Sequence, residues 1–557
     1  MATCIALVAL AVWTVVRFRF EALAPDDAEY LFVGHTVLDG HLPQASTGGF
    51  YDVRSPVYPV FLAFGDVLFH NQSFLGAHLV AWVLCVAALV VSVWVSHRIS
   101  SWPGAIGTGV ALAVTPVIWM TVPGMRIDLP LVACAVVTIW LILEPRSWRW
   151  ALAGAFLGLT VLLKETAGLL VFLPFAWLGA IPRPRWLRLT GWYTGVAFVV
   201  AAWWWVLVWV QERKLFPASG VEAVANRNVP RPFDLQPTAL ALIAVLAIGW
   251  GLFVVHFRRD PRARTVMVAG AALLPPAAYA WERELAIRQF VPIVVISCIA
   301  AGAALGSVAA GWMRRRGALL GAFAIVCAIA LVAIVASQAR IHPPRRSPGL
   351  SLPTSDWLRE NMQAGDVVAM TFRDRSETAL RLFDEAQVVD LPFEVDRELP
   401  ELDEFLWLHE FGGKLFGLDR RMMTARLTDP DTRWLVMTGP HHSRAARITD
   451  QLGQNTVPGI TRAAEFRDGN YYAVIYTIDP SIVPDGLLPI PAQVTAEAAL
   501  EWLDRAATRT SEEAAIERLV AANLEVRGSG PARSVLADRI GPRAATSLGL
   551  TAFIDPR

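Results

Sequence analysis

Runs of apolar residues long enough to cross a lipid bilayer recur along this chain, and they limit its fold more than any other feature. The hydrocarbon core of a bilayer is about 30 Å thick, so a helix needs about 20 apolar residues to cross it. The clear runs lie at 1–18, 74–96, 103–121, 128–143, 191–211, 238–257, 265–281, 290–312 and 317–338. Because 55% of the residues are hydrophobic and 17% are charged, we predict an α-helical polytopic membrane protein.

The apolar run at 150–181 is long for one span and carries Lys164 and Glu165 in its middle. We predict two short helices there, near 150–163 and 167–181, which brings the number of spans to about eleven. With the N-terminus in the cytoplasm, this number places the arginine-rich loops on one face, in agreement with the positive-inside rule. Those loops contain Arg98, Arg146, Arg149, Arg183, Arg185, Arg188, Arg258, Arg259, Arg262, Arg264, Arg314, Arg315 and Arg316. A single span at 150–181 would divide them between the two faces.

This topology places the long loop 19–73 and everything after residue 338 on the outer face. We predict a transmembrane domain at 1–340, a linker at 341–353, a small extracytoplasmic α/β domain at 354–480 and a helical C-terminal tail at 481–557. In the α/β domain the expected helices lie at 355–361, 375–383 and 443–452, and the expected strands at 366–371, 386–391, 434–438, 463–467 and 471–477. The tail is expected to be helical at 496–507 and 512–523.

The first apolar run and the cysteines exclude some alternatives. No basic segment precedes the first run and no small-residue cleavage site follows it, so we expect an uncleaved helix rather than a signal peptide. The five cysteines all lie in apolar runs, which argues against a disulfide framework and against a cysteine zinc site. The net charge is +1 and the basic residues lie in short loops, so nucleic acid is not an expected partner.

A group of acidic residues follows the first apolar run directly. Asp26, Asp27 and Glu29 stand within four positions, in the segment Ala24–Tyr30. Acids at the point where a helix leaves a bilayer are costly unless they face water or a polar cavity. A solvated turn is one interpretation, and the two aspartates could also cap a helix that begins at Ala28. The rest of the outer loop, with amphipathic pieces, Arg54 and several aromatics, favours surface helices over a cavity.

Five short motifs, in this order, resemble those of the GT-C glycosyltransferases that use polyprenyl-phosphate sugars. The nearest resemblance is to the group of protein O-mannosyltransferases and the aminoarabinose transferase of lipid A. The motifs are Asp26-Asp27 with Tyr30, Arg54-Ser55-Pro56-Val57-Tyr58-Pro59, Arg126-Ile127-Asp128, Gly154 and Gly158 before Lys164, and Arg288-Gln289-Phe290-Val291-Pro292. The resemblance covers residues 1–340 and extends loosely to the soluble domain, and it implies a GT-C-like fold.

The chain departs from the motifs of this group at two positions. The usual Lys-Pro-Pro of the first loop is Arg-Ser-Pro here, and Val53 stands where some members carry an acid thought to assist metal binding. The motifs therefore establish no cofactor, and a divalent metal stays an open alternative.

The resemblance also implies roles for single residues. The catalytic residues would be Asp26 as base, with Asp27 and Asp128 as supporting acids. Inverting transfer needs a carboxylate that takes a proton from the acceptor while the acceptor attacks the anomeric carbon. The lipid phosphate leaves with growing negative charge, so cations are needed beside it. Donor-phosphate binding would fall to Arg54, Lys164 and Arg288, and substrate binding to Tyr30, Tyr58 and Glu165.

Structural interpretations of the same residues stay open. Lys164 and Glu165 could pair with each other at a helix break, and Asp128 could be a helix N-cap. Arg288 could be an anchor at the membrane interface, and Tyr58 could belong to an interfacial aromatic belt.

The function predicted from these observations is an inverting glycosyltransferase, a hexosyl- or pentosyltransferase, in the cytoplasmic membrane. It would move one sugar from a polyprenyl-phosphate carrier to a lipid, glycan or protein acceptor on the outer face. A polytopic transporter or flippase is a second class, but such proteins show discontinuous helices in related halves of the chain, and only the break at 150–181 suggests that here. A third class is an inactive membrane scaffold whose outer domain binds a partner.

Overall fold

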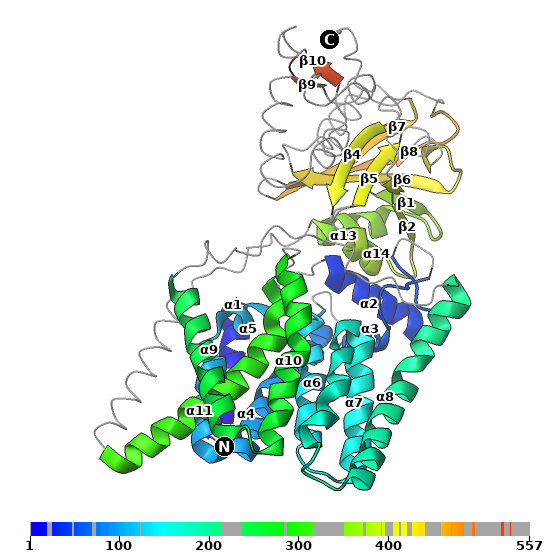
Figure 1. Cartoon of the computed structure of the whole chain (residues 1–557). Coiled ribbons are helices and arrows are strands. Elements are labelled where there is room, and N and C mark those ends of the chain that lie inside the picture. The colour runs from blue at the N-terminus through cyan, green and yellow to red at the C-terminus, as the bar shows by residue number, and fades with distance from the viewer. Residues whose placement is uncertain are drawn as a thin grey trace. The chain divides into compact units, whose positions relative to one another are not determined.

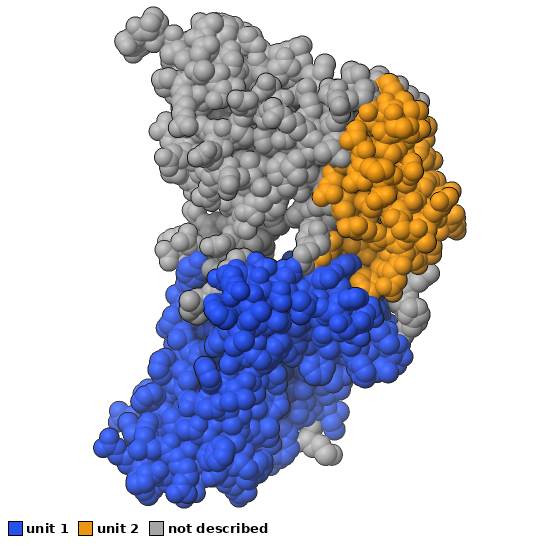
Figure 2. Space-filling view, turned by 90° about the vertical axis from the view of Figure 1, so that its right-hand side faces the viewer, with its two compact units in different colours: residues 1–44, 50–220, 225–346 blue, residues 45–49, 221–224, 347–557 orange. Residues whose placement is uncertain are grey.

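The computed structural model describes most of the first 316 residues and shorter segments of the remainder. The described residues are 2–18, 25–46, 50–69, 74–122, 124–213, 237–282, 287–316, 350–370, 375–390, 393–395, 405–411, 414–419, 426–440, 458–468, 471–483, 493–495, 525–527 and 535. The chain forms two compact units, which Figure 2 shows in different colours. Unit 1 contains residues 1–44, 50–220 and 225–346, and unit 2 contains 45–49, 221–224 and 347–557.

Unit 1 is helical throughout its described part (Figure 1). Its α-helices are α1 (Ala2–Phe18), α2 (Pro25–Leu38), α3 (Val57–Leu68), α4 (Leu75–Ala113), α5 (Pro116–Thr121), α6 (Asp128–Ile142), α7 (Ser147–Leu163), α8 (Arg183–Glu212), α9 (Pro237–Phe257), α10 (Pro261–Glu282) and α11 (Val291–Arg316). Two 3₁₀ helices, η1 (Glu165–Trp177) and η3 (Ile287–Phe290), connect them. The prediction of a mostly helical chain is confirmed.

Three described helices are long and apolar enough to cross a membrane by length and composition, namely those at Leu75–Ala113, Arg183–Glu212 and Val291–Gly311. Other apolar helices, such as Asp128–Ile142 and Ser147–Leu163, are shorter. The span predicted at 317–338 lies outside the described residues. The number of eleven spans therefore stays a prediction.

The two spans predicted at 74–96 and 103–121 are joined in the structure. The 39 residues of α4 are two helices that meet in a kink at Ser101, whose φ of 66° and ψ of −169° are not helical, and α5 follows the second of them. Pro103 follows this kink, and because its ring clashes with the preceding turn of a helix it favours a bend there. The break that the sequence predicted between 96 and 103 is thus present, at Ser101.

The run at 150–181 does break at Lys164, as predicted. Helix α7 ends at Leu163, and Lys164 has an extended backbone with φ −160° and ψ 116°. The second half is not an α-helix but the 3₁₀ helix η1, which has 13 residues and contains Pro174. Runs of 3₁₀ helix longer than four residues are uncommon. The tighter winding gives a rise of about 2.0 Å per residue, so these residues extend about 26 Å, compared with about 20 Å as an α-helix.

Glycines bring α4 and α11 into close contact in unit 1. A Cβ added to Gly302 would lie 2.3 Å from the backbone N of Thr108, and one on Gly306 would lie 2.1 Å from the carbonyl of Pro103. A Cβ on Gly107 would meet the carbonyl of Gly302 at 2.2 Å. Small residues at a helix crossing allow backbones to approach closely, which is the main source of packing energy between helices in a membrane.

The described part of the loop 19–73 contains the helices α2 and α3, in agreement with the prediction of helices there. Helix α2 packs on α3, and α3 packs on α4. Helix α3 has two distinct faces, because Tyr58 and Leu62 are buried while Phe61 and Phe64 are 55% and 53% exposed. This arrangement is that of an amphipathic helix, and at 12 residues α3 is too short to cross a bilayer. That it lies along the membrane surface stays a prediction.

Unit 2 contains a mixed five-stranded sheet in the order β2-β1-β6-β8-β7, in which β1 is parallel to β2 and β6 while β8 is antiparallel to β6 and β7. Its strands are β1 (Val367–Met370), β2 (Gln387–Asp390), β6 (Thr432–Pro440), β7 (Ile460–Asp468) and β8 (Tyr471–Ile478), and its helices α13 (Ser351–Asn361) and α14 (Arg375–Arg381). These correspond to the predicted strands and to two of the three predicted helices.

Three further strands of unit 2 were not predicted, and they form a separate antiparallel sheet: β3 (Phe393–Val395), β4 (Phe405–Phe411) and β5 (Lys414–Asp419). Two short strands, β9 (Gln493–Thr495) and β10 (Glu525–Arg527), pair in parallel. The helices expected at 443–452, 496–507 and 512–523 lie outside the described residues.

Candidate active site

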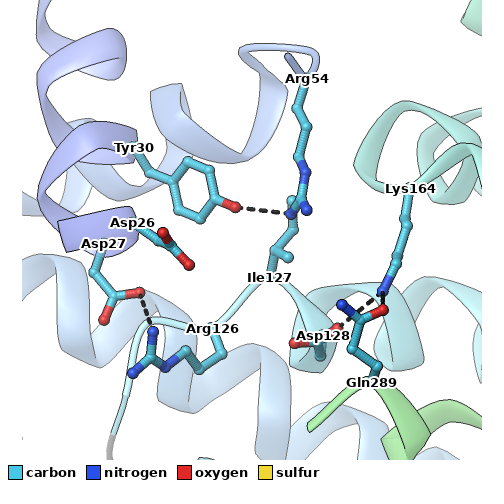
Figure 3. Close-up of a pocket in the computed structure, with 9 residues that line it drawn as sticks. All are labelled: Asp26, Asp27, Tyr30, Arg54, Arg126, Ile127, Asp128, Lys164 and Gln289. Carbon is cyan, nitrogen blue, oxygen red and sulfur yellow. Dashed lines mark hydrogen bonds and ion pairs between the residues drawn. The ribbon is translucent and has the colours of Figure 1, made fainter. Parts of the chain in front are cut away.

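A polar pocket in unit 1 brings together segments that are far apart in the sequence. It is lined by Asp26, Asp27, Tyr30, Arg54, Arg126, Ile127, Asp128, Lys164 and Gln289, and encloses about 270 Å³ including space open to solvent. Figure 3 shows Asp26 and Asp27 on one side of this group and Asp128, Lys164 and Gln289 on the other. Six of the nine lining residues were predicted site residues, so the sequence motifs meet in one place.

The acidic pair lies in the first turn of α2. The helix begins at Pro25, a residue suited to the first helical position, so Asp26 and Asp27 are inside the helix and not caps before it. Carboxylates in a first turn are favoured by the positive end of the helix dipole. The two acids differ in environment, because Asp26 is exposed while Asp27 is only 2% exposed. Asp27 pairs with Arg126, at 3.6 Å between Oδ1 and the guanidinium.

Arg54 lies in the loop before α3 and bonds to a tyrosine. Its guanidinium donates a hydrogen bond of 2.7 Å to the hydroxyl of Tyr30, and its carbon lies 6.0 Å from the centre of the Tyr30 ring. Among the residues that the structure describes, Arg54 forms no ion pair. Its positive charge is therefore held in place by a neutral phenol and is not cancelled by a carboxylate.

Asp128, Lys164 and Gln289 form the other side of the pocket. The ammonium of Lys164 donates a hydrogen bond of 2.9 Å to Oε1 of Gln289 and lies 3.5 Å from Oδ1 of Asp128. Both charged side chains are largely buried, with 13% of Lys164 and 3% of Asp128 exposed. Lys164 reaches this position because α7 ends one residue before it.

The lining therefore has three carboxylates and three cations. Two of the cations lie against a carboxylate, since Arg126 pairs with Asp27 and Lys164 with Asp128. Such a pocket can accept a phosphate on its cationic groups while it keeps an exposed carboxylate, Asp26, for proton transfer. Across the described part of the chain, no three His, Cys, Asp or Glu side chains gather in a way that could hold a metal ion.

Three predicted site residues are not in the lining. Tyr58 is buried at 1% exposure, donates a hydrogen bond of 3.0 Å to the carbonyl of Met125, and packs edge-on against Tyr30. Glu165 is the first residue of η1 and is partly buried. Arg288 lies in η3 beside Gln289, but its side chain is outside the described part of the chain. Their predicted roles in binding stay predictions.

Two structural interpretations of the sequence are resolved by this geometry. The ammonium of Lys164 lies against Asp128 and Gln289, not in an ion pair with its neighbour Glu165. Asp128 is not an N-cap, because Ile127 occupies that position and Asp128 is the first residue of α6.

Sequence reasoning missed the roles of Arg126 and Gln289. Each stands within two residues of a predicted site residue, inside a motif that the resemblance had identified. The neighbouring residues Asp128 and Arg288 were predicted instead, because the resemblance implies acids and phosphate-binding cations at these motifs. The pairing that makes Arg126 and Gln289 part of the pocket depends on α2 and α7, which are distant in the sequence.

Comparisons with known proteins agree with this fold. Residues 53–209 match the family model described as dolichyl-phosphate-mannose-protein mannosyltransferase. A sequence search of curated proteins finds no match. Among solved structures, ArnT from Cupriavidus metallidurans bound to undecaprenyl phosphate is similar, with a TM-score of 0.58, 14% identity, and coverage of 85% of this chain and 97% of that chain. The chain has the GT-C fold. The resemblance that the motifs indicated is thereby confirmed at the level of the fold.

Two further structures with the GT-C fold are similar to this chain. The apo state of the same Cupriavidus ArnT has a TM-score of 0.55, 14% identity, and coverage of 86% of this chain and 98% of that chain. The Archaeoglobus fulgidus oligosaccharyltransferase tethered to an acceptor peptide has a TM-score of 0.50, 11% identity, and coverage of 83% and 72%. The region that matches the family model contains Arg54, Asp128 and Lys164, whereas Asp26 and Gln289 lie outside it.

Proposed function

We propose that this protein is a membrane-embedded inverting glycosyltransferase that moves one sugar from a polyprenyl-phosphate carrier to an acceptor. The observation that carries the proposal is the pocket itself, in which an exposed carboxylate, Asp26, lies near Arg54 and Lys164. The similar ArnT structure was solved with undecaprenyl phosphate, which supports a lipid phosphate as the donor carrier here. The sugar and the acceptor, whether lipid, glycan or protein, are left open by this geometry.

In the proposed reaction, Asp26 takes the proton from an acceptor hydroxyl or amine. The acceptor oxygen or nitrogen forms a bond to the anomeric carbon while the bond from that carbon to the phosphate oxygen breaks. The electron pair of the broken bond stays on the phosphate, whose negative charge therefore grows in the transition state. Preorganised cations stabilise this growing charge, and a base near the attacking atom accepts the proton.

Arg54 is the strongest of the proposed phosphate ligands whose side chains the structure describes. Lys164 lies against Asp128, so part of its attraction for a phosphate is already offset. Arg54 is held by the hydroxyl of Tyr30, and among the described residues no carboxylate lies within ion-pair distance of it. A guanidinium can also hold two phosphate oxygens at once, which an ammonium cannot. We assign Arg288 to the same role from its place beside Gln289.

The second acid of the pair has a different role in this proposal. Asp27 is buried and paired with Arg126, so it is poorly placed to collect a proton from an incoming acceptor. We propose that it fixes the loop before α6 and thereby the position of Asp128. Asp128 in turn would orient the acceptor or the sugar.

We also propose that the pocket opens on the outer face of the cytoplasmic membrane. Asp128 stands at the start of α6, and Glu144 lies two residues beyond its end, about 22 Å away along a 15-residue helix. Glu144 binds Arg98, Arg146 and Arg149 at 3.4, 3.5 and 2.6 Å, so arginines gather at the end opposite to the pocket. Positively charged ends of membrane helices face the cytoplasm. In intact cells, a membrane-impermeant maleimide should then label Asp39→Cys and not Arg183→Cys.

The deciding experiment is sugar transfer by purified protein in proteoliposomes, with radiolabelled polyprenyl-phosphate sugars and a membrane extract as acceptor. Asp26→Asn should abolish transfer, because an amide cannot accept the proton. Asp39→Asn is the matched control, since Asp39 is exposed just beyond the other end of α2. Arg54→Ala should lower transfer and weaken donor binding, and Arg54→Lys should restore part of both.

Three results would count against the proposal. Transfer that survives unchanged in Asp26→Asn would move the base to Asp27 or Asp128. Donor binding that is unchanged in Arg54→Ala would exclude Arg54 as a phosphate ligand. No transfer by the wild type with any donor, together with movement of a fluorescent lipid across the bilayer, would favour a flippase.

A further inference from the structure

We propose that Gln289 is a positioning residue, which holds the ammonium of Lys164 toward the donor phosphate without cancelling its charge. This inference rests on the proposed function, because it concerns a lipid phosphate in the same pocket. Gln289 carries no charge and was not among the predicted site residues. Its side chain nevertheless makes the shorter of the two polar contacts of Lys164 given above, 2.9 Å compared with 3.5 Å.

The first step of the argument is that Lys164 needs an anchor. A lysine side chain has four rotatable bonds, and an ammonium is a compact point charge without a preferred direction of binding. Lys164 is the residue after the last residue of α7, and although its backbone N–H still bonds to the carbonyl of Thr160, its φ and ψ are extended. Ordering such a side chain on ligand binding costs conformational entropy, and this cost lowers the affinity. A hydrogen bond already formed in the free protein reduces that loss.

The second step concerns the chemistry of the anchor. Asp128 also lies against the ammonium, but a carboxylate offsets its positive charge. The amide oxygen of Gln289 accepts a hydrogen bond while it leaves the net charge of Lys164 unchanged. A glutamate of the same length at position 289 would bind the ammonium more tightly and would make the pair neutral. The neutral amide is therefore the group that both fixes the ammonium and leaves it attractive to an anion.

The third step concerns the elements that the bond connects. Gln289 lies in η3, directly before α11, and 125 residues separate it from Lys164. Arg288, the adjacent residue, is a proposed phosphate ligand. The hydrogen bond therefore joins the end of α7 to the backbone that carries Arg288. Through this bond Gln289 would fix the ammonium of Lys164 relative to the backbone of η3.

The test compares Gln289→Glu with Gln289→Leu. The two hypotheses, a tether between η3 and Lys164 and the proposed positioning role, predict opposite orders of harm for these substitutions. If Gln289 only ties η3 to Lys164, Gln289→Glu keeps or strengthens the tie and Gln289→Leu loses it. If Gln289 preserves the charge of Lys164, Gln289→Glu is the more harmful change for phosphate binding, although the protein stays folded. The control is Gln211→Glu, the same substitution at an exposed position of α8.

The measurement is the Kd of full-length protein in nanodiscs for undecaprenyl phosphate, with thermal stability and sugar transfer measured in parallel. We expect Gln289→Glu to raise Kd by about tenfold or more, since the added carboxylate would offset the charge of Lys164 and weaken its charge-assisted hydrogen bond to the phosphate, which contributes that much. Gln289→Leu should raise Kd by a smaller factor, and Gln211→Glu should leave it unchanged. The melting temperature of Gln289→Glu should equal or exceed that of the wild type.

Other outcomes would overturn either this inference or the proposed function. Wild-type affinity in Gln289→Glu, in a protein that transfers sugar, overturns the inference and leaves the proposed function standing. A loss of affinity in Gln289→Leu alone reduces Gln289 to a tether and equally overturns it. A wild-type protein that neither binds undecaprenyl phosphate nor transfers sugar overturns the proposed function itself.

Discussion

The ion pair between Asp27 and Arg126 gives a prediction whose size follows from the structure. The two groups are 3.6 Å apart, with 3% of the aspartate and 13% of the arginine exposed. At an effective dielectric constant of about 20, two unit charges at this distance attract each other by about 5 kcal/mol before the cost of removing them from water. That cost offsets most of the attraction, but it also means that either buried charge without its partner destabilises the fold.

We therefore expect Asp27→Asn and Arg126→Gln each to destabilise unit 1 by about 3 kcal/mol, because each leaves one buried charge without its partner. The double variant Asp27→Asn/Arg126→Gln should cost clearly less than the sum of the two. The difference, the coupling energy, should be about 1–3 kcal/mol. The assay is unfolding in mild detergent micelles at pH 7, followed by tryptophan fluorescence.

Asp39→Asn again serves as the control, because this exposed side chain should change the free energy of unfolding by less than about 0.5 kcal/mol. The reasoning would be refuted by single variants that each cost under about 1 kcal/mol and add up in the double variant. Additive small effects would mean that the two charges are solvated and do not fix the loop before α6.

Other substitutions test the packing and the ends of the helices. Gly302→Ala should destabilise the protein by about 1–3 kcal/mol, because the added Cβ would lie 2.3 Å from the backbone of Thr108. The control is Gly195→Ala, exposed on α8 with open space around it, which should be neutral or stabilising by up to about 1 kcal/mol. Tyr193→Phe should cost about 1 kcal/mol, because the buried hydroxyl donates a 2.8 Å hydrogen bond to a carbonyl of η1. The hydrogen bond from an arginine and nearby positive charges lower the pKa of Glu144 below its usual 4.5, so its stabilising contribution is present above pH 4.5 and is lost as the pH falls further. The difference in melting temperature between wild type and Glu144→Gln should accordingly shrink below that pH.

Much of the pocket could be predicted because its residues follow short local rules. Asp26 and Asp27 follow an apolar run, where acids are rare, and Arg54 lies among aromatics in the loop 19–73. Lys164 interrupts an apolar run that would otherwise continue. Placing a charged side chain next to or inside an apolar run costs free energy, so such residues can be singled out from the sequence as candidate site residues. The order of the motifs then predicted the GT-C fold.

The remaining features depend on tertiary contacts that no local pattern specifies. Gln289 is polar and uncharged at the start of an apolar helix, which is an ordinary place for a glutamine. Its contact with Lys164 appears only when η3 is placed beside the end of α7. Similarly, hydrophobic periodicity could not distinguish the 3₁₀ helix η1 from an α-helix, because the segment is apolar on nearly every side. The strands β3, β4 and β5 were missed among the charged residues of 393–419.

The winding of η1 determines how far apart its two ends stand. Each residue advances about 0.5 Å more along a 3₁₀ helix than along an α-helix, so rewinding Glu165–Trp177 into an α-helix would shorten it by about 6 Å. That is twice the length of the hydrogen bond between Lys164 and Gln289. If Trp177 stayed in place, such rewinding would draw Lys164 away from Gln289 and Asp128. With Trp177 held in place, deleting a single residue of η1 would shift Lys164 by about 2 Å relative to Asp128 without altering any side chain of the pocket.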